Sequence, residues 1–170
     1  MLRDAVQTVL LRELAALRRS VESYPDEASL WALPGHVPNA AGTLALHLAG
    51  NLQHYVGAVL GHTGYVRDRD AEFARRNVPR DELLAEIDAA AVAVERGLAE
   101  YGDDALEAPY PEQMGGRTVA TSVYLIHLAS HLAYHLGQVD YHRRTVTSEG
   151  SGVGALPLAA LPPYQPESSA

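Results

Sequence analysis

Hydrophobic residues recur every three to four positions along four long stretches of the chain, which is the spacing of amphipathic helices. These stretches cover residues 2–22, about 39–60, about 80–101 and about 118–144. Connections that contain proline and glycine separate them, and we find no alternating pattern typical of strands. The pattern therefore predicts an all-α protein in which four helices form one bundle with long loops.

The connections and the C-terminal tail complete this organisation. Asn39 is the expected N-cap of the second helix, and the charge-dense residues 65–78 predict a loop with a helical turn. Residues 147–170 are rich in Ser, Gly, Pro and Ala. We therefore expect a bundle domain over 1–146 and a tail that is partly docked, through Leu156 to Leu161, and partly disordered.

The fourth stretch combines a hydrophobic composition with a narrow polar stripe. At 100° per residue, the polar positions fall within roughly 80° of arc. They are His127, His131, His135, Gln138 and His142. The flanks and the opposite face are apolar, so the pattern predicts a helix buried nearly all round. Buried imidazoles need partners, and a divalent metal is a partner that several of them can share.

Spacing restricts which histidines could bind one ion. Imidazoles four residues apart on a helix are neighbours, whereas those eight apart are separated by about 12 Å along the axis. The possible pairs are therefore His127/His131 and His131/His135. The natural third ligand is His47, which shares a face of the buried second helix with Asn51. In the competing interpretation, the histidines bind no metal. Their ring nitrogens form hydrogen bonds with carbonyl groups or water, or the face that carries them packs in a dimer interface.

We do not expect the other histidines to take part in such a site. His54 lies about 10 Å beyond His47 along the same helix, so we expect it to be structural. His36 and His62 stand beside proline and glycine and are expected to be exposed. His142 lies near the end of its helix, where an imidazole interacts favourably with the helix dipole.

Composition narrows the function further. The net charge is -8 without a basic cluster, which argues against a nucleic-acid partner. The chain has no cysteine, so a metal must be held by histidine and oxygen ligands. We see neither a targeting segment nor the ~20 apolar residues of a membrane span, and we expect a cytoplasmic protein that binds a small molecule. The sequence between His131 and His135 also lacks the glutamate of zinc peptidases.

Two short motifs resemble those of a known family. They are His47-Leu-Ala-Gly-Asn51-Leu in the second helix and His131-Leu-Ala-Tyr-His135-Leu-Gly-Gln138 in the fourth. With the charged segment 66–73, they resemble the DinB-like (YfiT-like) metal-binding four-helix superfamily over about residues 1–146. The resemblance implies that His47, His131 and His135 bind a divalent ion, and it leaves His127 as an outer position.

The same resemblance suggests an activity. Characterised members of that superfamily include enzymes that transfer low-molecular-weight thiols such as bacillithiol, and a mycothiol-dependent maleylpyruvate isomerase. It implies a metal-dependent enzyme that transfers such a thiol to an electrophilic substrate, or related isomerase or hydrolase chemistry. Zinc is the first choice of ion, with nickel, iron and manganese as alternatives. Asn51 and His127 are candidate catalytic residues, and Gln138 and His127 are candidates for orienting the ligands.

The alternative is a non-catalytic bundle that binds a metal or small ligand as a sensor or scaffold. A third interpretation is an empty bundle whose histidines pack between subunits. An open pocket above the imidazoles would favour an enzyme, and a fourth protein ligand would favour a binding role. We also expect a homodimer, since bundles of this kind often bury a face by pairing.

Overall fold

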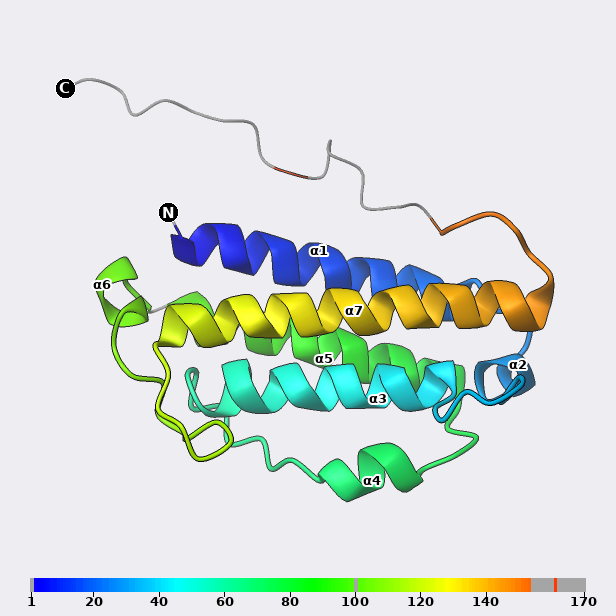
Figure 1. The fold of residues 1–170 in the computed structure, drawn as a ribbon, viewed down its shortest axis with the longest axis horizontal. Coiled ribbons are helices and arrows are strands. Elements are labelled where there is room, and N and C mark those ends of the chain that lie inside the picture. The colour runs from blue at the N-terminus through cyan, green and yellow to red at the C-terminus, as the bar shows by residue number, and fades with distance from the viewer. Residues whose placement is uncertain (1, 100, 154–160, 162–170) are drawn as a thin grey trace.

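Four long helices run side by side along the molecule (Figure 1). The computed structural model describes residues 2–99, 101–153 and 161. The long helices are α1 (Leu2–Glu22), α3 (Ala41–Leu52), α5 (Arg80–Ala99) and α7 (Thr121–Thr147). In the described part of the chain there is no β-strand, and the predicted all-α bundle is confirmed.

Shorter helices interrupt the connections between the long ones. They are α2 (Glu27–Leu30), the π-helix η1 (Gln53–Ala58) that continues α3, α4 (Arg69–Ala74) and α6 (Asp103–Leu106). The predicted helical turn in the charge-dense loop is α4. It begins where Asp68 accepts a hydrogen bond of 2.9 Å from the amide of Ala71, which is the action of an N-cap.

The core lies between two diagonal pairs of helices. Helix α1 packs mainly on α5 and α7, and α3 packs on the same two neighbours. The residues that fill the centre are fully excluded from solvent. Among them are Leu10 and Leu17 of α1, Leu48 of α3, Leu83 of α5 and Leu125 of α7. This arrangement places α3 beside α7, so residues on their facing sides can meet.

Close approach of η1 to α5 depends on glycine. A Cβ atom at Gly97 would overlap the carbonyl oxygen of Val56, and one at Gly61 would lie 2.6 Å from the Cα atom of Gly97. Both distances are far inside normal contact, so larger residues would separate the two helices. The glycines thereby hold the end of the α3–η1 segment against the bundle.

Two sequence predictions about local structure are wrong. The N-cap of α3 is Ala40, which makes no side-chain capping bond, so Asn39 lies one position too early for that role. The prediction that the fourth helix is buried nearly all round fails for its outer face. Helix α7 stands at a corner of the bundle, where one chain supplies neighbours on only part of its circumference.

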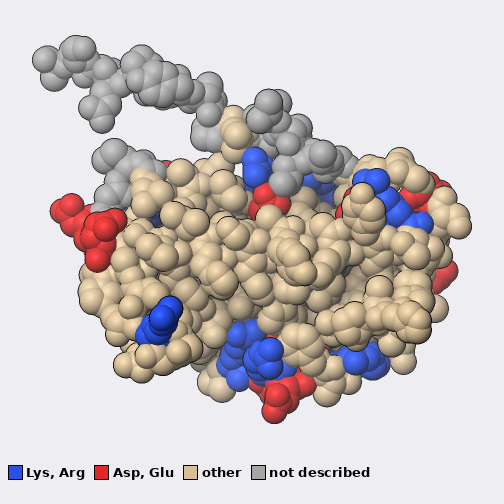
Figure 2. All heavy atoms as spheres, viewed as in Figure 1, with Lys and Arg blue, Asp and Glu red and all other residues tan. Residues whose placement is uncertain are grey.

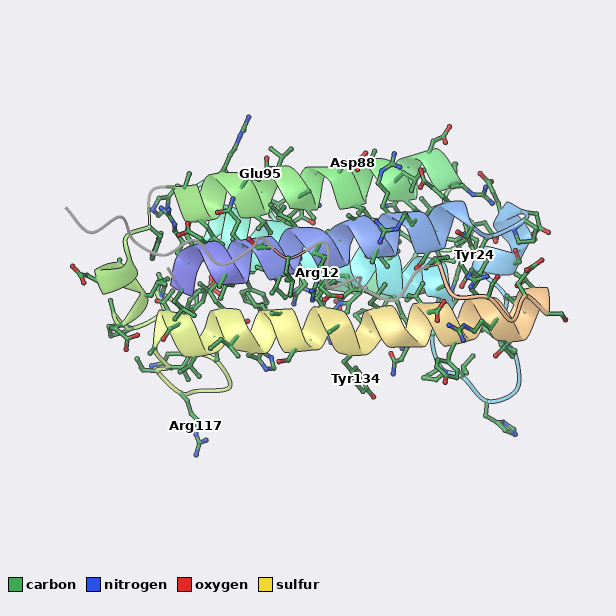
Figure 3. All side chains as sticks on the ribbon, turned by 90° about the horizontal axis from the view of Figure 1, so that it is seen from above. Arg12, Tyr24, Asp88, Glu95, Arg117 and Tyr134 are labelled. Atoms are coloured by element: carbon green, nitrogen blue, oxygen red, sulfur yellow. The ribbon has the colours of Figure 1, made fainter. Side chains whose placement is uncertain are left out.

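The outer face of α7 is apolar and exposed. Four large residues on it are between 51% and 71% exposed, namely Val123, Ile126, Tyr134 and Tyr141. Tyr134 projects away from the bundle in Figure 3. Figure 2 shows that the broad face formed by α3 and α7 carries mainly uncharged side chains in its central part. The hydrophobicity of α7 therefore exceeds what the core of one chain requires.

Helix α7 ends at Thr147, and Ser148 follows with a left-handed backbone at φ 59°. The buried Arg143 contacts the carbonyl oxygen of Ser151, which holds the start of the tail against α7. The segment Leu156 to Leu161 that was expected to dock lies, apart from Leu161, outside the described residues. None of the helices described combines the length and hydropathy needed to cross a lipid bilayer.

Candidate metal centre

Three imidazoles from two helices meet at one point. His47 comes from α3, and His131 and His135 stand one turn apart on α7, the helix that packs beside it. One nitrogen from each ring lies within 4.8 Å of the other two. Within the part of the chain that the structure describes, no other group of three His, Asp or Glu side chains could share an ion in this way.

The distance between two of these imidazoles suits a tetrahedral cation. The Nε2 atoms of His47 and His131 are 3.3 Å apart. Nitrogen ligands placed ~2.0–2.1 Å from a tetrahedral zinc ion are themselves about 3.3–3.4 Å apart. The three rings meet nearly at right angles, at 83°, 89° and 84°, so they approach one another by their edges.

A carboxylate fixes the orientation of His47. Oε2 of Glu72 lies 3.0 Å from Nδ1 of His47, and both side chains are buried. An ionised carboxylate only accepts hydrogen bonds, so Nδ1 carries the proton and the lone pair of Nε2 faces His131. This carboxylate–histidine arrangement recurs at protein metal sites, where it sets the tautomer and increases the basicity of the ligand.

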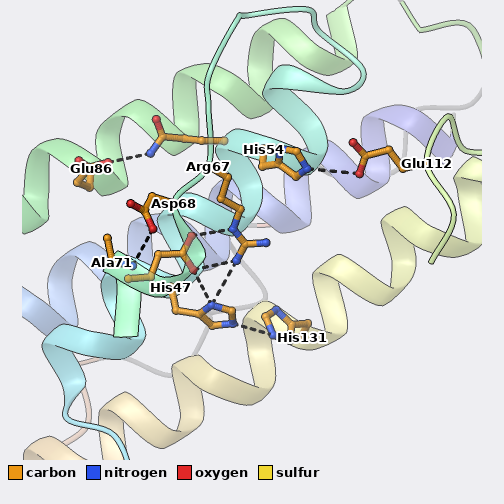
Figure 4. A network of polar contacts seen from close by, with 10 residues as sticks. His47, His54, Arg67, Asp68, Ala71, Glu86, Glu112 and His131 are labelled. Carbon is orange, nitrogen blue, oxygen red and sulfur yellow. Dashed lines mark hydrogen bonds and ion pairs between the residues drawn. The ribbon is translucent and has the colours of Figure 1, made fainter. Parts of the chain in front are cut away.

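Arg67 holds that carboxylate in place (Figure 4). Its Nε donates to Oε1 of Glu72 at 2.7 Å and its Nη2 donates to Oε2 at 2.9 Å, which is the bidentate pairing of a guanidinium. Burial opposes ionisation of Glu72, but the hydrogen bonds from His47 and Arg67 outweigh it and hold its pKa below the ordinary value. Glu72 is therefore an anion at neutral pH.

Gly50 makes room for Glu72 against α3. A Cβ atom at Gly50 would overlap Oε1 of Glu72 and would lie 2.9 Å from its Cδ. The glycine therefore lets the carboxylate of α4 reach His47, one turn earlier on α3. Sequence reasoning overlooked Gly50, Arg67 and Glu72. Two signals were available: the resemblance of the charged segment 66–73 to the family, and a glycine inside a hydrophobic helix, where it costs about 1 kcal/mol relative to alanine.

The two imidazoles of α7 are also oriented. Nδ1 of His135 lies 2.6 Å from Oε1 of Gln138. The amide oxygen can only accept, so Nδ1 donates and Nε2 of His135 is left with a lone pair. Nδ1 of His131 is buried without a hydrogen-bond partner. Burial, followed by the neighbouring imidazoles of His135 and His47, lowers the pKa of His131 to about 4, so this ring is neutral at pH 7.

These side chains fit a divalent cation. The donor set consists of nitrogen atoms alone, and His47 and His135 each keep one ring nitrogen with a free lone pair. The family comparison agrees with this geometry: the model of the DinB superfamily matches residues 10–139. The chain belongs to the DinB superfamily. No curated protein and no solved structure matches it.

The match confirms the family suggested by the two histidine motifs, and the matched range contains every residue of the cluster described above. Its three imidazoles could hold a metal ion in this DinB-superfamily chain. Metal binding itself and the identity of the ion remain predictions.

Two other candidates lie outside the cluster. His127 is exposed and stacks on Tyr124, with ring centroids 5.8 Å apart and planes inclined by 19°. Its ring centroid is 6.2 Å from that of His131, farther than those of the other two imidazoles. Asn51 is buried one turn after His47, and no described residue forms a hydrogen bond with its side chain. The structure thus brings neither candidate into the group of three.

The remaining histidines divide into exposed and structural ones. His36 and His62 are exposed, as predicted. His54 lies 3.4 Å from Glu112, away from the cluster (Figure 4). These three rings are therefore separate from the site.

His142 has a different role from the one predicted. It is buried, and its Nε2 donates to the carbonyl oxygen of Ala32 while its Nδ1 accepts from the hydroxyl of Tyr24, both at 2.8 Å. Burial lowers its pKa, so it is held neutral and does not act as a cation at the helix end. The sequence could not reveal these partners, because they come from the distant connection between α1 and α3.

Proposed function

We propose that this protein is a divalent-metal-dependent enzyme that transfers a low-molecular-weight thiol to an electrophilic substrate. His47, His131 and His135 are the proposed ligands, and zinc is the proposed ion, with nickel, iron and manganese as alternatives. The observation that carries the proposal is the convergence of three imidazoles from two helices. Membership of the DinB superfamily supports it.

The composition of the cluster supports catalysis over a purely structural metal site. No fourth His, Asp or Glu of the described residues joins the three imidazoles. The nearest carboxylate, on Glu72, is occupied by His47 and Arg67 on the far side of the ring. Structural zinc sites use four protein ligands, whereas catalytic sites use three and keep a position for water or substrate.

The protein's own groups would set the properties of this site. With a divalent ion held there, the site would acidify a thiol or a water molecule and so supply a nucleophile near neutral pH. Glu72 and Arg67 fix the ring of His47, and Gln138 fixes that of His135. We assign His127, the exposed imidazole next to His131, as the candidate proton carrier to solvent. Asn51 forms no hydrogen bond with any of the three imidazoles, and we assign it no role.

Metal analysis tests the first part of the proposal. Wild-type protein loaded with zinc and then desalted is expected to retain about one ion per chain. His131→Ala is expected to lose it, and His36→Ala, which alters an exposed imidazole, is expected to retain it. Equal and near-zero metal in wild type and His131→Ala would contradict the assignment of the site.

A screen of thiols against electrophiles tests the second part. Zinc-loaded wild type is expected to accelerate thiol consumption with at least one pair, and His131→Ala is not. The competing function is a non-catalytic metal-binding bundle. It predicts the same metal content but no acceleration with any pair, so the two measurements together separate the functions.

A further inference from the structure

A cavity of about 470 Å³ lies beside the imidazole cluster, between α7 and the connection from α2 to α3. His135 and Gln138 belong to its wall on the side of the cluster. Tyr134 and Tyr141 of α7 and Val37 of the connection also line it. Its volume lies within the ~300–1,000 Å³ typical of sites for small molecules.

The only ionisable side chains in the wall of this cavity, apart from the tyrosine hydroxyls, are two histidines. None of the residues that line it is Asp, Glu, Lys or Arg. Of its two histidines, His142 has both ring nitrogens engaged and is held neutral by burial. An ionic group entering the cavity would lose water without meeting a counter-ion, which is costly. The tyrosine rings and Val37 instead offer contact to an apolar or aromatic group.

One hydrogen-bond donor stands where the cavity meets the cluster. The Oε1 atom of Gln138 accepts from His135, so the amide group of Gln138 presents its N–H bonds elsewhere. Gln138 is exposed, and no described residue accepts a bond from that amide nitrogen. A carbonyl oxygen on a bound molecule could accept it and would then lie next to His135.

We propose that this cavity binds the uncharged, apolar or aromatic body of the electrophilic substrate, with a carbonyl oxygen directed to Gln138. The inference rests on the proposed function in naming the occupant as the electrophile, and it deepens that function by defining the substrate's chemical class. In the metal-free protein, anionic and cationic electrophiles of equal size would bind more weakly, because none of the lining residues is Asp, Glu, Lys or Arg.

Binding can be measured without turnover. The full chain, both zinc-loaded and chelator-treated, is titrated with acetophenone, benzoate and toluene while amide NMR shifts of Val37, Leu44 and Thr145 are followed. Acetophenone is expected to give saturable shifts at these cavity residues in both forms. Benzoate, which has a similar ring and a negative charge, is expected to bind at least tenfold more weakly to the chelator-treated form.

Variants separate the apolar wall from the amide donor. Tyr134→Ser is expected to weaken acetophenone and toluene alike by roughly tenfold. Gln138→Leu is expected to weaken acetophenone about three- to tenfold and to leave toluene unchanged, since toluene has no acceptor. The matched control is Ile126→Ser, an exposed apolar residue of the same helix outside the cavity, which is expected to change neither.

The outcomes distinguish this inference from the proposed function. The inference is overturned if acetophenone does not bind, if benzoate binds the chelator-treated form equally well, or if Tyr134→Ser has no effect. If the protein does not bind zinc but acetophenone binds as described, the proposed metal chemistry is wrong. The assignment of an uncharged apolar or aromatic ligand to the cavity then still holds. If the protein binds zinc but acetophenone does not bind in the cavity, the inference is wrong and the electrophile binds elsewhere.

Discussion

Helix α7 carries two imidazoles, the buried His142 and the partly buried His131, whose ring nitrogens have different surroundings. His142 gives each ring nitrogen one partner, the hydroxyl of Tyr24 and the carbonyl of Ala32. His131 leaves Nδ1 without a partner and directs Nε2 to another imidazole 3.3 Å away. Burial lowers the pKa of both. The difference teaches that a satisfied buried histidine ties helices together, whereas convergent unsatisfied ones mark a place for a ligand.

The largest expected difference between His131 and His142 is in zinc affinity. His131→Ala should raise the dissociation constant for zinc by at least ~100-fold, about 2.7 kcal/mol, because it removes a ligand and not only its support. His142→Phe should change it less than about threefold. Competition with a chromophoric chelator measures both. A similar loss of affinity in the two variants would erase the distinction between the rings.

Next in size is the effect of the carboxylate behind His47. Glu72→Gln should weaken zinc binding about 10–100-fold, because it removes the charge that fixes the tautomer and basicity of that imidazole. Asp70→Asn, an exposed residue of the same short helix, is the matched control and should be neutral. The same chelator competition applies. Unchanged affinity in Glu72→Gln would show that the carboxylate only packs the loop.

A stability effect of about 1–3 kcal/mol is expected from overpacking at Gly50. Gly50→Ala should destabilise the protein because the new methyl group overlaps the carboxylate of Glu72. Gly137→Ala meets no atom within 4 Å and should instead stabilise the protein by about 0.5–1 kcal/mol. Urea unfolding gives both values. The Gly50→Ala effect should largely vanish in a Glu72→Ala background, and strict additivity would refute the proposed overlap.

The smallest expected effect is on the pH dependence of stability. The folded pKa of His142 lies below its ordinary value of 6.5, so between these values the unfolded chain binds more protons. The free energy of unfolding therefore falls as pH decreases below 6.5. In chelator-treated protein, His142→Phe should flatten this fall relative to wild type. Parallel profiles from urea unfolding at a series of pH values would contradict the assignment.

Much of the fold follows from local patterns. The 3.6-residue period placed four long helices within a few residues of their observed ends, when η1 is counted with α3, because each must bury one apolar stripe. The exposure of Ile126 and Tyr134 could not be predicted in this way. Whether a hydrophobic face is covered depends on which neighbours surround the helix, and one helix's composition does not specify them.

The proposed ligand residues of the site were predictable from the sequence, but the supporting residues Arg67 and Glu72 were not. Imidazole spacing left two possible pairs on the fourth helix, and resemblance to a family selected His131 and His135. The support from Arg67 and Glu72 was hidden in a charge-dense segment without periodicity, where charged residues usually face solvent. Only the packing of that segment on Gly50 reveals that one glutamate turns inward.

The short helix α4 has a consequence for the susceptibility of the chain to proteases. Its six residues are anchored to the bundle through the buried Glu72, while Arg75 and Arg76 directly after it include an exposed basic site suited to trypsin. A protease needs several residues to unfold locally before it can cut, so cleavage here reports how firmly the carboxylate is held. The rate of limited tryptic cleavage in this connection is therefore expected to increase when the contact between Glu72 and the imidazole cluster is lost.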